Sequence, residues 1–571
     1  MSFPTPLTPP YTPLTDSSSP VFIAKSQFPA HPNAIKALLT PPQTPEFELR
    51  AKQEEGRKLS DNEISYYLPS RGDGVNDMYV HHKLLASPSQ MTPSRILHIW
   101  AYQLLLHPLL SSTVEFREYE DISFVPSRPR NLVEALSTAS ERFSYIVDER
   151  DIIGTYLNGP RTLSNDRLGY LVVKGPSQSE GDEKVEYEFM LCATHYLGDG
   201  MALHSFMNEF YILLGSDLTT QEISQKITQK LGLESGLVEI PKSLEDRLPP
   251  SKSDFARIVG KEESRRSEAK LIGGQSFGSS WEKLPRHTVV PTISYDKDKT
   301  KGILGNCKKN GVTIAHAVFA LCNIAWARKT DDKIDPCLIY SALNLRPNMI
   351  PSTSTAKESF FHLAVGYFNI VLPTLLPSSI STSELFWHRA RMTKQQTIKA
   401  VKSPFVVARS QNTSMVRRER AVKWAKIDDE EELKSQQGNP GLGLGVEIAQ
   451  SEVQPTQQKK PPQAMQLPTP ETTPVVPVTA TQERKVSQRA LMGLSMLGNL
   501  DGKYKHAEFP SLELTSLTTG SRQRQGGLLL FAYTFAGKLW FSLGYDKNGF
   551  PPGVIEGFWS EVQNLIEEVL V

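Results

Sequence analysis

The sequence is poor in cysteine, and its four cysteines form no C-x-x-C pair; they are Cys192, Cys307, Cys322 and Cys337. Four thiols in 571 residues make neither a disulfide framework nor a zinc knuckle. We therefore expect free thiols, mostly buried, in a reducing compartment. The sequence also has no apolar run of about 18 residues, so no transmembrane segment is expected. Because no apolar stretch of signal-peptide length lies near the first methionine, we expect a cytoplasmic protein.

Neither sign of charge prevails in the sequence. Lys and Arg together number 63 and Asp and Glu together number 62, which gives a formal net charge of +1. Proteins that hold nucleic acids by their phosphates carry an excess of positive charge, so this balance argues against a nucleic-acid partner. Apolar residues make up 39% of the chain, enough for a large core, and the length predicts two or more domains.

Two segments lack the composition of a folded core. Residues 1–50 are rich in Pro, Thr and Ser, which predicts a disordered tail. Residues from about 428 to 486 contain no aromatic side chain and are dominated by Gln, Pro, Thr and Glu, which predicts a disordered insert. The rest of the sequence predicts two halves, 51–290 and 291–571, the second of which the insert interrupts.

Strand and helix patterns alternate through both halves without a repeat of about 20–50 residues, which predicts a mixed α/β protein. Ser60 and Glu63 form a capping-box pattern at a helix start, and Thr313 is expected to cap a long apolar helix. The segment 216–287 is polar and helical in character, as expected of an insertion or a bridge. Strands are expected at 78–85, 145–147, 168–173, 185–192, 288–295, 337–342, 368–372, 527–535 and 538–544, and the composition of a folded core returns at 491–497 after the insert. Further helices are expected at 92–107, 201–214, 314–328 and 554–570.

One motif is the strongest candidate for chemistry: His195-Tyr196-Leu197-Gly198-Asp199-Gly200, between an apolar strand and an amphipathic helix. A neutral imidazole can remove a proton from a hydroxyl or amine as it attacks an acyl carbonyl, and can return it to the leaving group. Asp199 need not touch the substrate, because its carboxylate can pair with a distant arginine and so hold the loop. Gly200 allows a close backbone approach or an unusual φ.

Two other interpretations of the motif remain open. His195 is a core histidine in the first, and Asp199 only caps the helix that follows. His195 and Asp199 are metal ligands in the second. The metal interpretation is disfavoured because the one further ligand close in sequence, His204, falls among the apolar residues of a helix. We therefore expect no metal and no bound cofactor.

The motif and the order of several other segments resemble the CoA-dependent acyltransferase superfamily. This group includes chloramphenicol acetyltransferase, plant BAHD acyltransferases, nonribosomal peptide condensation domains and mycobacterial polyketide-associated acyltransferases. The resemblance extends from about residue 57 to 571 without the insert. Besides the H-x-x-x-D-G motif, it is carried by Leu59 to Tyr66, His107 to Leu110, Gly311 to Ile314, Asn344 to Pro347, Gly366 to Asn369, Leu494 to Gly498 and Phe541 to Asp546.

Three features depart from the named subgroups. Thr194 stands where condensation domains carry a second histidine. The Asp-Phe-Gly-Trp-Gly motif of plant BAHD enzymes is absent, and the insert is unusually long. These departures favour a stand-alone O-acyltransferase of a fungal-like secondary-metabolite or lipid type.

The resemblance implies a fold of two chloramphenicol-acetyltransferase-like α/β halves with an active-site tunnel between them. His195 is then the general base in a ternary complex, and Asp199 orients the loop by pairing with Arg346. Ser495 and Asn369 are candidate donors to the oxyanion. Acyl-CoA is implied as a co-substrate, and a hydroxylated small molecule or lipid as the acceptor. We expect a monomer, because the two halves complete the site within one chain.

Two alternative functions remain. One is a free-standing enzyme like a condensation domain, which forms amides or esters from a carrier-protein thioester. The other is a catalytically silent scaffold, which has no chemical need of His195, Asp199 and Arg346. A basic run before the insert is interpreted as an exposed helix face, with CoA phosphates as the alternative contact; it comprises Arg417, Arg418 and Arg420.

Overall fold

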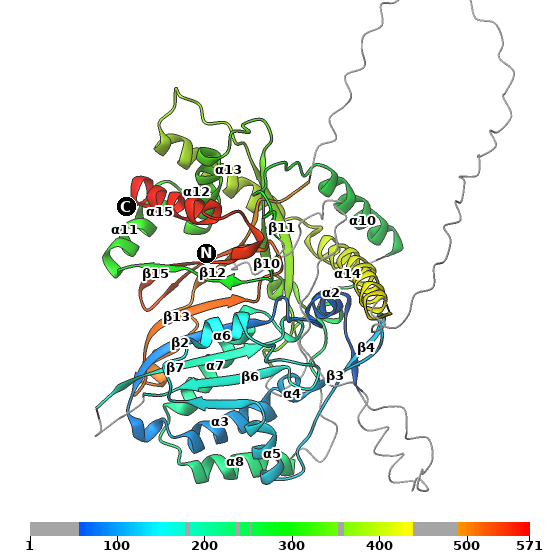
Figure 1. Cartoon of the computed structure of the whole chain (residues 1–571), viewed down its shortest axis with the longest axis vertical. Helices are drawn as coiled ribbons and strands as arrows, with labels where there is room; N and C mark the ends of the chain where they lie inside the picture. Colours follow the sequence, from blue (N-terminus) through cyan, green and yellow to red (C-terminus); the bar gives the residue numbers. More distant parts are fainter. Residues whose placement is uncertain are drawn as a thin grey trace, which may run out of the picture. The chain divides into compact units, whose positions relative to one another are not determined.

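The computed structural model describes residues 56–176, 183–233, 240–251, 253–282, 284–351, 359–437 and 488–571, which form three β-sheets with helices packed on them (Figure 1). The predicted tail and most of the predicted insert lie outside the described residues. The described residues up to Ala425 and from Gln488 onward form one compact unit, and the described part of a second unit, from Lys426, is the end of a helix.

A five-stranded sheet forms the centre of the first half. Its strand order is β13-β2-β7-β6-β5, with β13 at Glu513–Ser521, β2 at Met78–Ala86, β7 at Val185–Ala193, β6 at Gly169–Lys174 and β5 at Phe143–Ile146. Helix α3 (Pro93–Leu106) packs against α7 (Gly200–Leu214), and both contribute apolar side chains to the core of this sheet. The other elements of this half are β1 (Arg57–Lys58), α2 (Asp61–Ser70), η1 (Pro88–Gln90), α4 (Pro108–Ser111), β3 (Thr113–Glu118), β4 (Asp121–Val125), α5 (Leu132–Ser140), α6 (Ile152–Asn158), η2 (His195–Leu197), α8 (Thr220–Leu233), α9 (Leu244–Arg247) and α10 (Asp254–Ala269).

A seven-stranded sheet forms the centre of the second half. Its main path is β11-β10-β12-β14-β15-β8, and β9 also pairs with β15; the strands are β11 (Val365–Leu372), β10 (Cys337–Asn344), β12 (Met492–Asn499), β14 (Leu528–Phe535), β15 (Lys538–Asp546), β8 (Thr288–Val289) and β9 (Thr292–Tyr295). The apolar helix α12 (Ile314–Lys329) packs against α13 (Thr382–Val401) and α15 (Val554–Val569). The remaining elements are α11 (Lys297–Lys309), η3 (Arg346–Asn348), α14 (Val406–Gln437), η4 (His506–Glu508) and η5 (Lys547–Gly549).

The two faces of the seven-stranded sheet belong to different cores. Leu343, Phe368 and Met496 pack in the core that contains α12, α13 and α15. Ala342 and Val365 belong to the core that contains the five-stranded sheet and α7. Because side chains alternate along a strand, neighbouring residues of β10, β11 and β12 point to opposite faces. One face of this sheet is therefore turned toward the H-x-x-x-D-G motif and the other toward the helices.

The second half supplies an edge strand to the first. In Figure 1, β13 lies beside β2, and the two strands pair antiparallel from Glu513 with Leu85 to Ser521 with Met78. The sequence pattern predicts no strand at 513–521, so this connection is not among the expected elements. Its consequence is that the five-stranded sheet is not complete without a strand from the second half.

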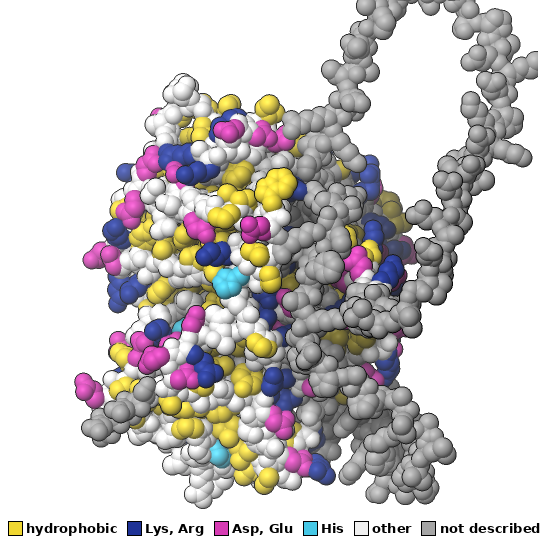
Figure 2. All heavy atoms as spheres, viewed as in Figure 1, with side chains coloured by type: hydrophobic (Ala, Val, Ile, Leu, Met, Phe, Trp, Pro, Cys, Tyr) yellow, Lys and Arg dark blue, Asp and Glu magenta, His cyan; other side chains and the backbone are white. Residues whose placement is uncertain are grey.

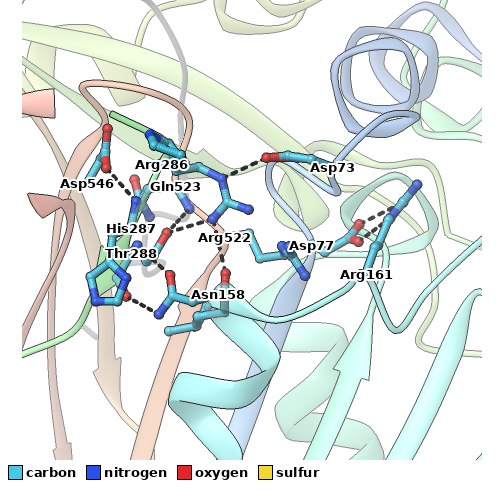
Figure 3. A network of polar contacts seen from close by, with 12 residues as sticks. Asp73, Asp77, Asn158, Arg161, Arg286, His287, Thr288, Arg522, Gln523 and Asp546 are labelled. Carbon is cyan, nitrogen blue, oxygen red and sulfur yellow. Dashed lines mark hydrogen bonds and ion pairs between the residues drawn. The ribbon is translucent and has the colours of Figure 1, made fainter. Parts of the chain in front are cut away.

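Polar contacts anchor the chain where it leaves β13 (Figure 3). Arg522 Nη1 donates to the Tyr156 carbonyl at 3.0 Å, and the Gln523 backbone N–H donates to Thr288 Oγ1 at 3.0 Å. Asn158 and Thr288 bond reciprocally, with the Thr288 N–H donating to Asn158 Oδ1 at 2.7 Å and Asn158 Nδ2 donating to the Thr288 carbonyl at 2.9 Å. These bonds join α6 of the first half to β8 and the β13 exit, and so hold the two sheets in one arrangement.

Most predicted elements are confirmed, and two need correction. The Ser60–Glu63 capping box is present at the start of α2, and Thr313 is the N-cap of α12. The single strand expected at 288–295 is two short strands, β8 and β9, because Pro291 between them lacks the N–H that a continuous ladder needs. Residues 428–437, expected in the disordered insert, are helical as the end of α14. Their Glu, Lys and Gln favour helix even without aromatic residues to form a core.

One face of the protein and the composition of the described helices bear on charge and on membrane spans. On the face seen in Figure 2, positive and negative side chains intermingle with apolar ones. Among the described helices, none by itself has the length and apolar composition to cross a membrane, and α11 and α12 meet that test only as a pair bent by 91°.

Candidate active site

His195 lies where the chain leaves the central strand β7 and turns into α7. The residue opens a single 3-10 turn, His195–Leu197, and Gly198 then continues with extended backbone. Asp199 is the N-cap of α7. The His195 side chain is buried, with 5% of the residue exposed. The end of a buried strand and the start of a buried helix thus fix this loop from both sides.

The surroundings of His195 set its protonation state. Its Nδ1 lies 3.1 Å from the Gly198 carbonyl oxygen, which can only accept a hydrogen bond, so Nδ1 carries the proton. The pKa of His195 is lowered to about 4, mainly by burial and to a smaller degree by the charge of Arg417, although backbone hydrogen bonds and the charge of Asp199 act to raise it. At neutral pH the imidazole is therefore uncharged, and Nε2 is its basic nitrogen. The Tyr66 ring stacks on the imidazole with ring centres 4.3 Å apart and planes 25° apart.

Asp199 holds the loop through three N–H donors. Its Oδ1 accepts from the Ala202 N–H at 3.2 Å, and its Oδ2 accepts from Arg346 Nη1 at 2.8 Å and the Ala364 N–H at 3.1 Å. The side chain is fully buried. Burial alone raises the pKa of this carboxyl, but Arg346 and the hydrogen bonds prevail and the pKa is lowered. Both interpretations of Asp199 are therefore correct, because Oδ1 caps α7 and Oδ2 pairs with Arg346.

Arg346 reaches Asp199 from the end of β10, where it opens the 3-10 turn η3. The Arg346 backbone N–H donates to Asn344 Oδ1 at 3.0 Å, and Nη2 donates to the His362 carbonyl at 3.4 Å. These contacts fix the segment from both sides. The structure thus brings His195, Asp199 and Arg346 together, although Arg346 lies 147 residues beyond Asp199 in the chain.

Gly200 does not have the geometry that the sequence analysis expected of it. It begins α7, and it is not among the glycines with positive φ. A Cβ built at this position would meet only Leu497 Cδ2, at an ordinary 3.8 Å. The expectation of an unusual φ is therefore wrong, and the contact shows instead that β12 passes directly beside the motif.

Ser495 and Asn369 lie on the face of the seven-stranded sheet that is turned toward the motif. Ser495 Oγ and Asn369 Oδ1 are buried without a hydrogen-bond partner among the described residues. Ser341 pairs with Leu494, and Tyr340 pairs with both Gly493 and Asn369. Asn369, Tyr340 and Gly493 thus lie in line across three strands, and Ser495 lies two residues beyond Gly493 on β12. With about 4.8 Å between strands and about 3.3 Å per residue, the Cα atoms of Ser495 and Asn369 are about 12 Å apart. The two cannot both bind one oxyanion, and Ser495 is the nearer to the β12 segment beside the motif.

Three residues close to His195 had no role assigned from the sequence, and a fourth, Arg417, was interpreted differently. Tyr66 and Tyr367 meet through their hydroxyl groups, and the Arg417 guanidinium carbon lies 4.7 Å from each of their ring centres. Arg417 Nη1 also donates to Asn62 Oδ1 at 3.2 Å. Arg417 is buried, so its interpretation as part of an exposed helix face is wrong. The tyrosines lie in segments that carried the family resemblance, which was the only signal that pointed to them.

Other histidines and acidic groups do not assemble a metal site. Among the described residues, no group of three or more His, Cys, Asp and Glu side chains is arranged to hold a metal ion. His204 lies inside α7, where its Nδ1 contacts the Tyr504 hydroxyl at 2.9 Å. Burial lowers the pKa of His204 to about 3. It is a core residue that links α7 to the second half.

A pocket of about 610 Å³, mouth included, lies between α12, α13 and the seven-stranded sheet. Leu343, Phe368 and Met496 line it. These side chains point to the sheet face opposite Ser495 and Asn369, so this pocket is not part of the His195 site.

Comparisons with known proteins show a likeness of fold only. No family model matches the chain, and no curated protein matches its sequence. The structure is similar to TRI3 trichothecene 15-O-acetyltransferase from Fusarium sporotrichioides, with a TM-score of 0.63, 11% identity, and coverage of 90% of this chain and 95% of that one. It is also similar to polyketide synthase associated protein 5 from Mycobacterium tuberculosis (TM-score 0.51, 12% identity, 90% and 97% covered). A third similar structure is the EpoB NRPS cyclization-docking bidomain from Sorangium cellulosum (TM-score 0.51, 12% identity, 93% and 93% covered). The mixed α/β fold of this chain is thus the fold of these acyltransferase and peptide-synthetase domains.

Proposed function

We propose that this protein is an acyltransferase that moves an acyl group from acyl-CoA to a hydroxyl of a small-molecule or lipid acceptor, with His195 as the general base. The observation that carries the proposal is the state of this histidine. It is buried and uncharged, its Nδ1 proton is held by the Gly198 carbonyl, and its loop is anchored by the Asp199–Arg346 pair. The fold shared with an acetyltransferase supports the same reaction class.

The geometry supports a direct transfer within a ternary complex. The acceptor oxygen attacks the thioester carbonyl carbon while its proton passes to His195 Nε2. The carbonyl oxygen becomes an oxyanion, and when the carbon–sulfur bond breaks the proton passes from His195 to the CoA sulfur. Asp199 stays ionised and does not exchange a proton, because its role is to hold the loop and to stabilise the protonated imidazole that forms.

Ser495 is the favoured donor to the oxyanion. Its hydroxyl is buried without a partner among the described residues, on the face turned toward the motif, and it lies two residues before Leu497, whose Cδ2 is 3.8 Å from where a Cβ on Gly200 would lie. A buried hydroxyl without a partner is costly unless a ligand supplies one. Asn369, two strands away, is then placed to contact another part of a substrate.

The test is thiol release from acyl-CoAs of short to long chain, with mixed hydroxylated acceptors and mass spectrometry for new esters. His195→Ala is the test variant, and His98→Ala, on the outer part of α3, is the matched control. Release that needs His195 and yields an ester supports the proposal. Transfer from a carrier-protein thioester but from no CoA would favour the condensation-type alternative. Neither transfer nor acyl-CoA binding would refute the acyltransferase proposal and favour the scaffold.

A further inference from the structure

Arg417 is a buried cation whose contacts are not acidic. Its guanidinium carbon lies 4.7 Å from the ring centres of Tyr66 and Tyr367, and Nη1 donates to Asn62 Oδ1 at 3.2 Å. Within the described ranges no carboxylate forms an ion pair with it. Arg418, the next residue of α14, pairs with both Glu120 and Asp61. The buried member of this pair of arginines is thus the one that lacks an acid.

A charge taken out of water needs a partner of opposite charge or a full set of hydrogen bonds. Two aromatic rings partly stabilise a guanidinium through its faces, and Arg417 also forms a side-chain hydrogen bond with Tyr66, but none of these contacts supplies a negative charge. The N–H groups point outward in the plane of the guanidinium, where they match the two oxygens of a carboxylate. The surroundings of Arg417 therefore fit a cation that is completed by an anionic ligand.

The position of Arg417 identifies where that ligand comes from. The Tyr66 ring centre is 4.3 Å from the His195 ring centre and 4.7 Å from Arg417 Cζ, so Cζ lies within about 9 Å of the imidazole centre. Both residues are buried, Arg417 with 6% and His195 with 5% exposed, and the same Tyr66 ring contacts both. The phosphates of CoA are separated from its thioester by the whole pantetheine arm, which places them too far away.

We infer that Arg417 binds a carboxylate carried by one of the two substrates, on either the acceptor or the acyl group, close to the carbon that reacts. This inference rests on the proposed acyl transfer at His195. The carboxylate occupies the donor edge of the guanidinium, between the aromatic pair and the reacting groups. Asn62 sets the orientation of Arg417, because Asn62 Nδ2 donates to the Val365 carbonyl at 3.2 Å while its Oδ1 accepts from Arg417.

Binding of the carboxylate also changes the pKa of His195, the proposed base. Among the described residues, Tyr66 from α2 stacks on His195, and the charges of Arg417 from α14 and of Asp199 from its own loop act on it. The charge of Arg417 lowers the pKa of His195. A carboxylate on Arg417 cancels that charge, so the pKa of His195 rises when such a substrate binds, and the base becomes stronger only in the complex.

The experiment compares carboxylated with neutral substrates in two arms. The acyl arm compares succinyl-CoA and glutaryl-CoA with butyryl-CoA. The acceptor arm uses acetyl-CoA and compares 6-hydroxyhexanoate and 12-hydroxydodecanoate with their methyl esters. The variants are Arg417→Gln and Arg417→Lys, and Arg418→Gln is the matched control that removes one positive charge from the same helix. Thermal melting confirms that each variant is folded.

We expect the carboxylated substrates of one arm to have a kcat/KM about 10- to 100-fold higher, the range of a charge-assisted hydrogen bond. Arg417→Gln removes this preference, Arg417→Lys retains part of it, and Arg418→Gln leaves it unchanged. The arm in which the carboxylate preference appears shows whether the acyl group or the acceptor carries the carboxylate. The pH dependence of kcat with that substrate should also lie at higher pH than with its neutral analogue.

Transfer without a carboxylate preference in either arm, or a preference that survives Arg417→Gln, would overturn the inference and leave the proposed function intact. If no CoA thioester is used, the proposed function fails, and calorimetry then decides about Arg417. Tighter binding of the carboxylated compounds than of their neutral analogues, lost in Arg417→Gln, would support the carboxylate site. Equal binding would refute it.

Discussion

Removing Arg346 should destabilise the protein more than removing the charge of Asp199, although the two form one ion pair. Asp199 is fully buried, whereas the Arg346 side chain is 25% exposed. Arg346→Met leaves a buried carboxylate without its cation, a change that costs about 3–5 kcal/mol. Asp199→Asn leaves a guanidinium that water reaches in part, and it weakens hydrogen bonds worth about 1.5–3 kcal/mol. The double variant should cost about as much as Asp199→Asn alone.

The measurement is urea unfolding of the wild type, both single variants and the double variant, followed by tryptophan fluorescence. The coupling free energy between the two sites should then equal the cost of Arg346→Met alone, about 3–5 kcal/mol. It should also depend on pH. In the wild type the pKa of Asp199 is lowered, so its stabilising contribution is present above the unfolded pKa of 3.8 and is lost as the pH falls below it.

In Arg346→Met burial raises the pKa of Asp199, so this variant loses stability as the pH rises from the unfolded value. The difference in unfolding free energy between the wild type and Arg346→Met should therefore be smaller at pH 5 than at pH 7. If the losses of unfolding free energy in the single variants add up to that of the double variant, the buried charge does not dominate this site. The same follows if Asp199→Asn loses more unfolding free energy than Arg346→Met.

Four further outcomes follow. The kcat/KM of the wild type should be flat above about pH 5 and fall near pH 4, where His195 takes up a proton; a fall centred near pH 6.5 would contradict a buried base. Ser495→Ala should lower kcat about 10²- to 10³-fold with little change in KM, and an equal rise in KM would instead assign Ser495 to ground-state binding. Gly200→Ala should change the unfolding free energy by less than about 0.5 kcal/mol, because a Cβ there has only an ordinary contact. Glu245→Gln should stabilise the protein at pH 8 but not at pH 4. Burial raises the pKa of Glu245 from 4.5 to about 7, so the wild type loses stability as the pH rises from 4.5 through 7. Equal effects of the substitution at both pH values would refute this.

Local sequence patterns determined where the helices and the main strands lie. The Ser60–Glu63 capping box, the N-cap at Thr313 and the apolar stripe after the motif all act within a few residues, so they can be recognised in the sequence alone. The same holds for the position of His195 at the end of a buried strand. The break of one predicted strand at Pro291 was also present in the sequence, since proline cannot donate to a ladder.

Arrangements that join distant segments could not be derived in this way. The pairing of β13 with β2 depends on the path of the chain between two sheets, and the pattern of Glu513–Ser521 does not specify that partner. The Arg346 partner of Asp199 was expected only from the family resemblance, because 147 residues separate the two. The geometry of Gly200 was misjudged because a glycine's φ depends on the turn in which it lies.

The chain by itself determined the candidate base, because the H-x-x-x-D-G motif and its flanking strand and helix are continuous in sequence. Only the tertiary structure decided the state of that base. The burial that holds His195 neutral and the stacking of Tyr66 and Arg417 beside it come from α2 and α14, which are far apart in sequence. The motif and the spacing of apolar residues beside it are set by neighbours along the chain. Desolvation and charge–charge interaction depend instead on distances in space, and folding alone sets those distances.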